Sequence, residues 1–313
     1  MSSSSVFLSG PRYVLGEIAS HYGDLPDLKE RAGELGLPYA PQVWGWGQVH
    51  RTHKSLEELA VEAGRATLRA AGVDPSSVDA LVLCCTSFPG GPDSHGGFVR
   101  TISEGLGLHD ADFLGVTLDR CTNLLAGLRV AEAFVAAGTH RRVLVVTTDR
   151  VTAEAERLAK FALFSDGAAG ALVSDTDGEY EIVASAAAHE TKDLDWSNQI
   201  SPELSRRVNT HLMKHASRRA PHGASMGIDQ VDILMHTNVF EAIIVMKELQ
   251  AGFSAAQLFT DNIARVGHCF AADPVINLAD LAAAGRLRDR GSYLLAASVP
   301  GVRYGILLRK QPR

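Results

Sequence analysis

Cys121 lies where a predicted strand turns into a predicted helix, a position that favours thiol chemistry. An apolar stripe after the cysteine predicts a helix from about Thr122 to Ala137. Free amide groups and the dipole at a helix N-terminus favour an anion, lower the pKa of a thiol and can hold an oxyanion. The position leaves two interpretations open, a nucleophilic thiolate or a small buried hydrophobic residue.

The other cysteines show no sequence pattern that indicates a chemical role. Cys84 and Cys85 lie inside the apolar run Ala80–Thr86, which is typical of small buried side chains. Four cysteines are too few and too scattered for a disulfide scaffold, and none forms a CxxC pair that would indicate structural zinc. The sequence therefore predicts no metal site.

Helical and β-rich segments alternate along the first half of the chain. Apolar residues recur at helical spacing from Ser55 to Gly72, and short apolar runs predict strands over 80–85, 113–118, 142–148 and 169–173. These runs are continuous rather than alternating, which indicates a sheet covered on both faces. The predicted fold class is α/β.

The second half of the chain repeats this order. Residues 231–235 resemble 78–82, and the later runs 292–298 and 304–308 correspond to 143–148 and 168–173. A repeat of half the chain length indicates duplication with pseudo-twofold packing. We therefore predict an N-terminal half, 1–175, that carries the cysteine, and a C-terminal half, 176–313, with the active site where they meet.

The bulk composition excludes several classes of function. The chain has 313 residues, is 46% hydrophobic and carries a formal net charge of −6, so it is not expected to bind nucleic acid or an anionic membrane. Four serines follow Met1 without a basic and apolar leader, and no apolar run is long enough to span a bilayer. We expect a cytoplasmic protein.

Four segments, in this order, resemble β-ketoacyl-acyl-carrier-protein synthase III of the thiolase superfamily. Cys121 lies in a segment similar to the family's nucleophile region, and 164–171 (FSDGAAGA) is close to its FGDGAGA segment. His236-Thr237-Asn238 occupies the place of the family's HQAN motif, and 267–272 (GHCFAA) that of GNTSAA. The agreement in order and spacing extends from about Leu8 to Arg309.

The resemblance implies a five-layered α-β-α-β-α thiolase-like fold, two pseudo-symmetric halves and a homodimer. It implies that Cys121 takes an acyl group from an acyl-CoA or acyl-carrier-protein thioester, with no cofactor. His236 would assist thiolate formation or bind the carbonyl of the second substrate. His268 replaces the family's asparagine, and related elongating synthases use two histidines with the cysteine.

Further site residues follow from these positions. Asp273 either orients His268 or is a turn carboxylate before Pro274. The substrate-binding candidates are Trp44 and Trp46, which would stack on a base unless they are buried aromatics, Phe88 in the loop 87–97, Asn238, and Gly301.

Besides the replacement at His268, further departures from the family pattern limit the assignment. An ungapped match places Pro300, which has no N–H, where a glycine donates to the oxyanion, whereas a shift of one residue places Gly301 there. Glu241 replaces a basic residue thought to help carrier-protein docking. These departures indicate a specialised enzyme of secondary metabolism.

Three functions remain open at this point. The first is decarboxylative condensation of the Cys121-bound acyl group with a malonyl-type thioester. The second is acyl transfer to an oxygen or nitrogen acceptor without decarboxylation. The third, from a different class, is a catalytically silent partner subunit of a condensing-enzyme complex.

Overall fold

The computed structural model describes residues 5–86, 90, 92–176, 178–195, 200–219 and 225–312. Ten strands of these residues form one sheet in the order β10-β9-β11-β12-β8-β1-β7-β6-β4-β5. The strands of its first half are β1 (Phe7–Leu15), β4 (Ala80–Cys84), β5 (Asp112–Val116), β6 (Arg142–Asp149) and β7 (Gly167–Ser174). Those of its second half are β8 (Tyr180–His189), β9 (Ile233–Met235), β10 (Leu258–Phe259), β11 (Ser292–Val299) and β12 (Val302–Lys310).

The two halves of the sheet have the same topology. In the first half β1, β7 and β6 are antiparallel neighbours, while β4 pairs parallel to both β6 and β5. In the second half β8, β12 and β11 are antiparallel neighbours, while β9 pairs parallel to both β11 and β10. Only Phe7 and Leu8 of β1 pair with β8 to join the halves. Each half of the chain therefore builds one half of the sheet.

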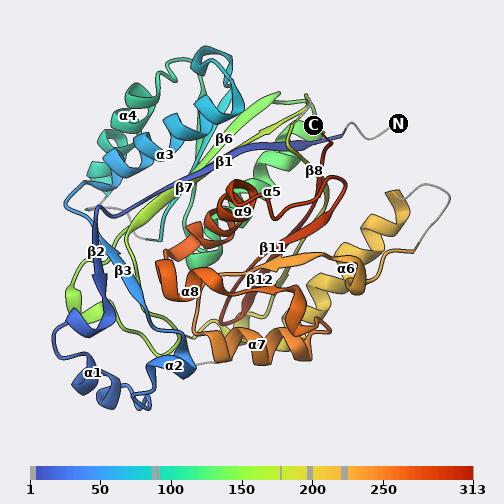
Figure 1. Ribbon diagram of the computed structural model, residues 1–313. Coiled ribbons are helices and arrows are strands. Elements are labelled where there is room, and N and C mark those ends of the chain that lie inside the picture. The colour runs from blue at the N-terminus through green and yellow to red at the C-terminus, as the bar shows by residue number, and fades with distance from the viewer. Residues whose placement is uncertain are drawn as a thin grey trace.

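The helices form three layers around these two half-sheets (Figure 1). The central layer is α5 (Asn123–Ala136) and α9 (Asp273–Ala283), and the core around it takes apolar side chains from both half-sheets. The outer layer over the first half contains α3 (Leu56–Ala71) and α4 (His95–Leu106). The outer layer over the second half is α6 (Pro202–Arg219). The predicted α-β-α-β-α layering is confirmed.

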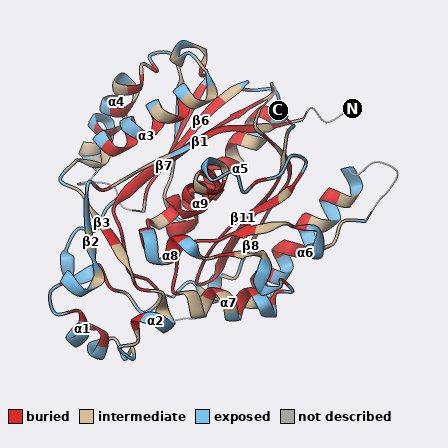
Figure 2. Cartoon of the chain, in the orientation of Figure 1, coloured by how far each residue is buried: buried red, intermediate tan, exposed pale blue. Residues whose placement is uncertain are grey.

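Burial follows these layers (Figure 2). The central helices and the strands beside them are largely buried, whereas α6 and α7 (Glu241–Gln250) expose their outer faces. A smaller lobe is built from α1 (Leu28–Glu34), α2 (Pro41–Trp44), β2 (Ile18–His21) and β3 (Gln48–Arg51), and α8 (Asp261–Val266) lies beside β3. Apolar residues of this lobe pack on Leu158, Leu163 and Phe240.

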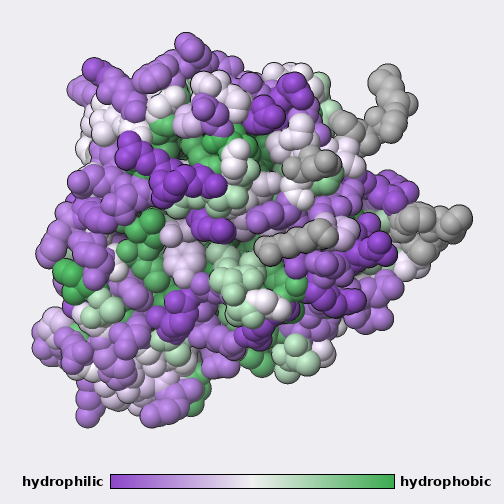
Figure 3. Space-filling model, turned by 45° about the horizontal axis from the view of Figure 1, so that its top comes forward, coloured by the Kyte–Doolittle hydropathy of each residue, from purple (hydrophilic) through white to green (hydrophobic). Residues whose placement is uncertain are grey.

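Hydrophilic side chains cover most of the face shown in Figure 3, with apolar residues in smaller patches between them. Among the described residues, no helix has the length and apolar composition needed to cross a membrane.

One strand differs from the expectation of a sheet covered on both faces. β5 is the last strand at its edge, and four of its five residues are exposed. Phe113 is 64% exposed and Leu118, just beyond the strand, is 92% exposed. The apolar run was correctly predicted as a strand. However, the composition of an apolar run cannot distinguish a strand covered on both faces from an exposed strand at the edge of a sheet.

The close approach of β1 to α3 requires a glycine at position 10. Gly10 has φ +57° in a bulge of β1, and an added Cβ would lie 2.5 Å from the carbonyl oxygen of Thr67 and 2.9 Å from the amide nitrogen of Ala71. Gly72 has φ +66°, but a Cβ there meets nothing within 4 Å.

We expect Gly72→Ala to lower the free energy of unfolding by about 1–2 kcal/mol. The added Cβ meets no other atom, so the only cost is that of holding an alanine in the left-handed backbone conformation. Gly10→Ala adds a clash with backbone atoms and should cost about 3 kcal/mol or more. Urea unfolding of the two variants and the parent measures the difference. Equal losses for the two variants would contradict the close β1–α3 contact.

Candidate active site

Cys121 lies at the start of the central helix, in a turn that precedes α5. It is the middle residue of the short 3-10 helix η4 (Arg120–Thr122) and is 2% exposed. Arg120, just before it, has φ +55°, a strained conformation for a non-glycine residue. The side chain of Asn123 fixes the turn, since its Nδ2 donates to the carbonyl of Cys85 at 3.0 Å and its Oδ1 accepts from the amide of Asp119 at 3.0 Å.

His268 lies in the loop between α8 and α9. Its amide donates to the carbonyl of Leu163 at 2.8 Å, and its carbonyl accepts from the amide of Ser165 at 2.9 Å. These bonds hold the backbone of His268 against the FSDGAAGA segment. The following 3-10 helix η10 (Phe270–Ala272) contacts η4, which brings the loop to the turn that carries Cys121.

Asp273 holds the His268 ring in one orientation. Its Oδ2 lies 2.5 Å from Nδ1 of His268 and accepts from the amide of Asn238 at 2.6 Å, while its Oδ1 accepts from the amide of Cys269 at 2.7 Å. Asp273 and His268 are 0% and 1% exposed. Of the two interpretations of Asp273, the geometry matches the carboxylate that orients His268.

The second ring nitrogen of His268 faces the thiol. Nε2 is buried and has no other hydrogen-bond partner among the described residues. Burial would lower the pKa of His268, but the charges of Asp273 and Cys121 and the hydrogen bonds to them raise it to about 10. A thiol, an imidazole and a carboxylate thus stand in sequence, an arrangement suited to accept and return a proton.

His236 points into a different environment. Nδ1 lies 3.0 Å from the carbonyl of Thr237, and Nε2 lies 2.8 Å from Nζ of Lys247. Burial lowers the pKa of His236, and the positive charges of Lys247 and Arg303 lower it further. Both ring nitrogens are therefore occupied by groups other than Cys121, and the ring stays neutral at physiological pH.

Lys247 belongs to a buried ionic network between α7 and the β11–β12 hairpin. Its Nζ lies 2.8 Å from Oε1 of Glu248, and Nη1 of Arg303 lies 2.8 Å from the same oxygen. Ser298 accepts from both Lys247 and Arg303 at 2.9 Å. Burial lowers the pKa of Lys247 to about 7, against the opposing charge of Glu248. Sequence analysis missed this network, although a lysine followed by a glutamate in an otherwise apolar helix was a visible signal.

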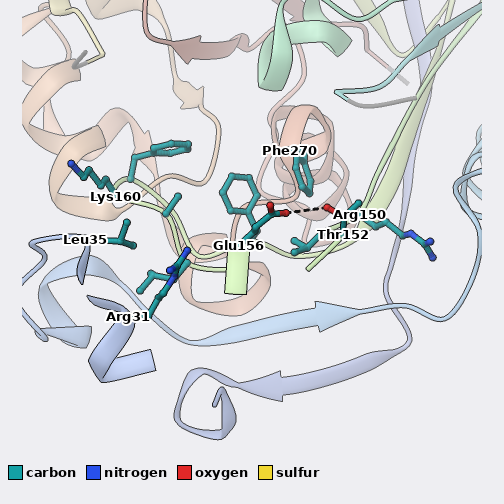
Figure 4. Close-up of a pocket in the computed structure, with 12 residues that line it drawn as sticks. Arg31, Leu35, Arg150, Thr152, Glu156, Lys160 and Phe270 are labelled. Carbon is teal, nitrogen blue, oxygen red and sulfur yellow. Dashed lines mark hydrogen bonds between the residues drawn. The ribbon is translucent and has the colours of Figure 1, made fainter. Parts of the chain in front are cut away.

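A cavity of about 670 Å³ is separated from His268 by phenylalanine side chains, and Cys121, His268 and Asp273 do not line it. Phe164 and Phe270 line it and also pack on His268, with ring centroids 4.8 and 6.2 Å from the imidazole. Figure 4 shows Arg31 reaching the cavity from α1, with Lys160 and Arg150 on opposite sides of the view. Glu156 supplies one carboxylate, which accepts from Thr152 at 3.0 Å. Sequence analysis did not select these lining residues, which come from three separate segments.

The predicted substrate-binding residues are not gathered at this cavity. Trp46 is 6% exposed and belongs to the core of the small lobe, whereas Trp44 is half-buried and packs against this core, with its ring centroid 5.4 Å from that of Phe240. Asn238 ties Asp273 to Gly267 and Asn277 through its own hydrogen bonds. Phe88 lies outside the described residues.

Gly301 and Pro300 form the tight turn between β11 and β12. Val299 pairs with Val302 across the turn, and Gly301 has φ +74°. The carbonyl of Gly301 accepts from the amide of Glu190 at 2.8 Å, and a Cβ at Gly301 would meet backbone atoms of 190–194 at 2.8–3.0 Å. Backbone packing therefore accounts for the glycine at position 301.

Proteins of known family are similar to this chain in sequence. The family of 3-oxoacyl-[acyl-carrier-protein] synthase III matches residues 117–191, which include Cys121. A β-ketoacyl-[acyl-carrier-protein] synthase III of Solibacter usitatus is 32% identical over 130 residues, or 39% of this chain and 37% of that protein. The synthase III of Listeria innocua is 21% identical over 83% of this chain and 85% of its own.

Solved structures match over almost the whole chain. The acyltransferase ChlB3 has a TM-score of 0.77 at 16% identity and covers 98% of both chains. Xanthomonas campestris OleA has a TM-score of 0.78 at 14% identity, covering 98% of this chain and 99% of its own. FabH of Pseudomonas aeruginosa has a TM-score of 0.74 at 21% identity and covers 99% of both chains.

The fold is thus the thiolase-like fold shared by these α/β proteins. Within it, the sequence is similar to that of β-ketoacyl-[acyl-carrier-protein] synthase III, the family that its motifs resemble, and the chain spans less than half the length of the curated synthase III that it matches at 32% identity.

Replacement of Asp273 by Asn tests the assembled site. The Asn amide would donate to Nδ1 of His268, so the ring proton would move to Nε2, which could no longer accept the thiol proton. We expect the rate of Cys121 alkylation by iodoacetamide to fall about tenfold or more at neutral pH, the effect of one pKa unit.

Asp280→Asn is the matched control, because Asp280 lies on the same helix and bonds Tyr13 and Asn262 instead of the site. Intact-protein mass against time gives both rates. A folded Asp273→Asn variant that reacts at the parental rate would show that Asp273 does not control the thiol.

Proposed function

We propose that this protein transfers an acyl group from a thioester through Cys121 to an acceptor that His268 deprotonates. The observation that carries the proposal is the buried series Cys121, His268, Asp273, with the 2.5 Å contact between His268 and Asp273. Thiol, base and orienting carboxylate are the groups that nucleophilic acyl transfer needs.

The first half-reaction acylates the cysteine. Nε2 of His268 holds the proton taken from Sγ, and the Cys121 thiolate attacks the thioester carbonyl. The C–S bond to the donor breaks, and the departing thiolate takes the proton back from Nε2. Asp273 keeps Nδ1 protonated throughout, so that Nε2 alone exchanges the proton.

The second half-reaction releases the acyl group. The hydroxyl or amine of an acceptor gives its proton to Nε2 and attacks the acyl-Cys121 carbonyl. The bond between the carbonyl carbon and Sγ breaks, and the thiolate is restored. His268 is suited to this step because it replaces an asparagine, which cannot act as a base.

The cavity behind Phe164 and Phe270 suits a thioester donor. Of its lining residues, Arg31, Arg150 and Lys160 are cationic and Glu156 is the one acid, which favours anionic phosphates. The three phenylalanines Phe161, Phe164 and Phe270 offer an apolar wall on the side of His268. Acyl-CoA and acyl-carrier-protein thioesters combine these two properties, and a solved OleA structure contains lauroyl-CoA.

Decarboxylative condensation with a malonyl-type thioester is the second candidate. The synthase III relatives favour it by name. His236 would then bind the carbonyl of the malonyl group, but both of its ring nitrogens are occupied. This favours the heteroatom acceptor. The changes at His268, Pro300 and Glu241 support a specialised metabolic role for either reaction.

Mass analysis after exposure to a panel of acyl-CoAs and acyl-carrier proteins tests the proposal. We expect a mass gain equal to the acyl group, lost in Cys121→Ala and kept in Cys84→Ala, because Cys84 is fully buried with a raised pKa. The acyl-enzyme is then offered a malonyl thioester or a set of alcohols and amines. Ester or amide formation supports the proposed acceptor, while CO₂ release supports condensation. Folded protein that forms no adduct with any donor contradicts the proposal and favours a silent subunit.

We propose further that two copies associate through the β5 edges. The strand has no partner on its outer side within the described sheet, and Phe113 and Leu118 expose apolar surface there. Antiparallel pairing of β5 with its own copy satisfies the free backbone groups and buries these side chains by twofold symmetry.

A charge on this edge should separate the copies. We expect the parent to sediment as a dimer and Phe113→Lys as a monomer, because an edge lysine opposes strand pairing. Met246→Lys is the control, since Met246 is 57% exposed on α7. A monomeric parent, or a Phe113→Lys variant that remains dimeric, would refute pairing through β5.

A further inference from the structure

Aromatic rings stand between the cavity and the reacting groups. Phe161, Phe164 and Phe270 line the cavity and pack on the ring of His268. The ring centroid of Phe164 lies 4.7 Å from that of Phe270 and 4.8 Å from that of His268, so these three rings are in packing contact. A thioester in the cavity reaches Cys121 past these rings only if one of them moves.

Phe164 is held more firmly than Phe270. The Phe164 residue is 8% exposed, its amide donates to the carbonyl of Arg157 at 2.8 Å, and its carbonyl accepts from Nη1 of Arg157 at 3.1 Å. Phe270 is half-buried and borders the cavity, so its ring has open volume to turn into. Figure 4 shows Phe270 on the opposite side of the view from Arg31. Of these two rings, Phe270 moves with the smaller loss of buried contacts.

The backbone of Phe270 is strained. Its φ is +49°, in the left-handed region that a glycine adopts without steric cost and a bulky side chain rarely adopts. Arg120, just before Cys121, has φ +55°, and the turns that contain the two strained residues, η10 and η4, are in contact. Strained residues that a fold retains cluster at functional sites. A large ring at a position that suits a glycine indicates that the ring itself is required.

We propose that Phe270 is a specificity-determining residue, whose ring limits the width of the acyl group that passes from the cavity to Cys121. The proposal rests on the acyl transfer through Cys121 described above. A straight acyl chain passes after a small turn of the ring into the cavity. A branched or aromatic acyl group needs a wider opening, which the packing of Phe270 on Phe164 and His268 opposes.

Two maleimides of different size test the inference without an acyl donor. The full chain is treated with N-ethylmaleimide and with N-pyrenylmaleimide, and the rates in Cys121→Ala are subtracted. Each rate is divided by that of the same reagent with free cysteine, and the ratio of the pyrenyl value to the ethyl value measures the width of the passage. We expect this ratio to rise about tenfold or more in Phe270→Gly, which removes the ring and relieves the strained backbone.

Arg290→Gly is the matched control. Arg290 also has a left-handed φ, of +61°, and its amide donates to the carbonyl of Lys310 at 3.0 Å, before the start of β11. Arg290 does not line the cavity, so a glycine there relieves the same kind of strain and should leave the ratio equal to that of the parent. A folded Phe270→Gly variant with the parental ratio, or a parent with equal values for both maleimides, overturns the inference.

A larger ring covers the case in which Phe270→Gly does not fold. Phe270→Trp narrows the passage, so the ratio should fall severalfold below that of the parent. An unchanged or higher ratio in folded Phe270→Trp overturns the inference.

The panel of acyl-CoAs adds a measurement on the reaction itself. Phe270→Gly should form adducts with branched and aromatic acyl groups that the parent takes up slowly. A parent that accepts branched and straight acyl groups at equal rates overturns the inference. The expected maleimide ratios without any acyl adduct would support the role of Phe270 and count against the proposed acyl transfer.

Discussion

The contact between His268 and Asp273 is the constraint on which the site depends. A buried imidazole without a charged partner would lose its proton, because burial disfavours the cation. The negative charge of Asp273 instead raises the pKa of His268. Asp273 is the first residue of α9, and its carboxylate also accepts hydrogen bonds from the amides of Cys269 and Asn238. The same carboxylate therefore fixes the loop that carries His268, the segment after β9 that carries His236, and the start of a central helix.

The duplicated sheet explains how groups from distant segments meet. α5 and α9 occupy equivalent places in the two halves and pack together in the shared core. Cys121 precedes one of these helices and His268 precedes the other. Because η4 and η10 are in contact where these helices start, each half supplies one member of the proposed reacting pair. The site exists only where both halves are present.

Much of this could be predicted from sequence, and the failures have a common cause. Apolar runs and helical spacing located the strands, and family motifs identified the fold and placed Cys121 and His268 within it. Asp273 followed from its short separation from His268. Contacts between side chains that are distant in sequence could not be predicted from such local patterns. The pairing of His236 with Lys247 depends on where α7 places Lys247 relative to the end of β9 and to Ser298 of β11, and the burial of Trp46 depends on the folding of the small lobe. Exposure of Phe113 depends on strand order, which no local pattern encodes.

The register of β1 also affects how the chain reaches this structure. Leu15 pairs with Gly167 and Phe7 pairs with both Ser174 and Glu181, so β1 has no sheet partner until synthesis has passed residue 167. Its apolar residues and free backbone groups stay open during that interval, which favours association between nascent chains. Late pairing of an early strand makes synthesis, more than the finished molecule, the stage at which this protein is most vulnerable to aggregation.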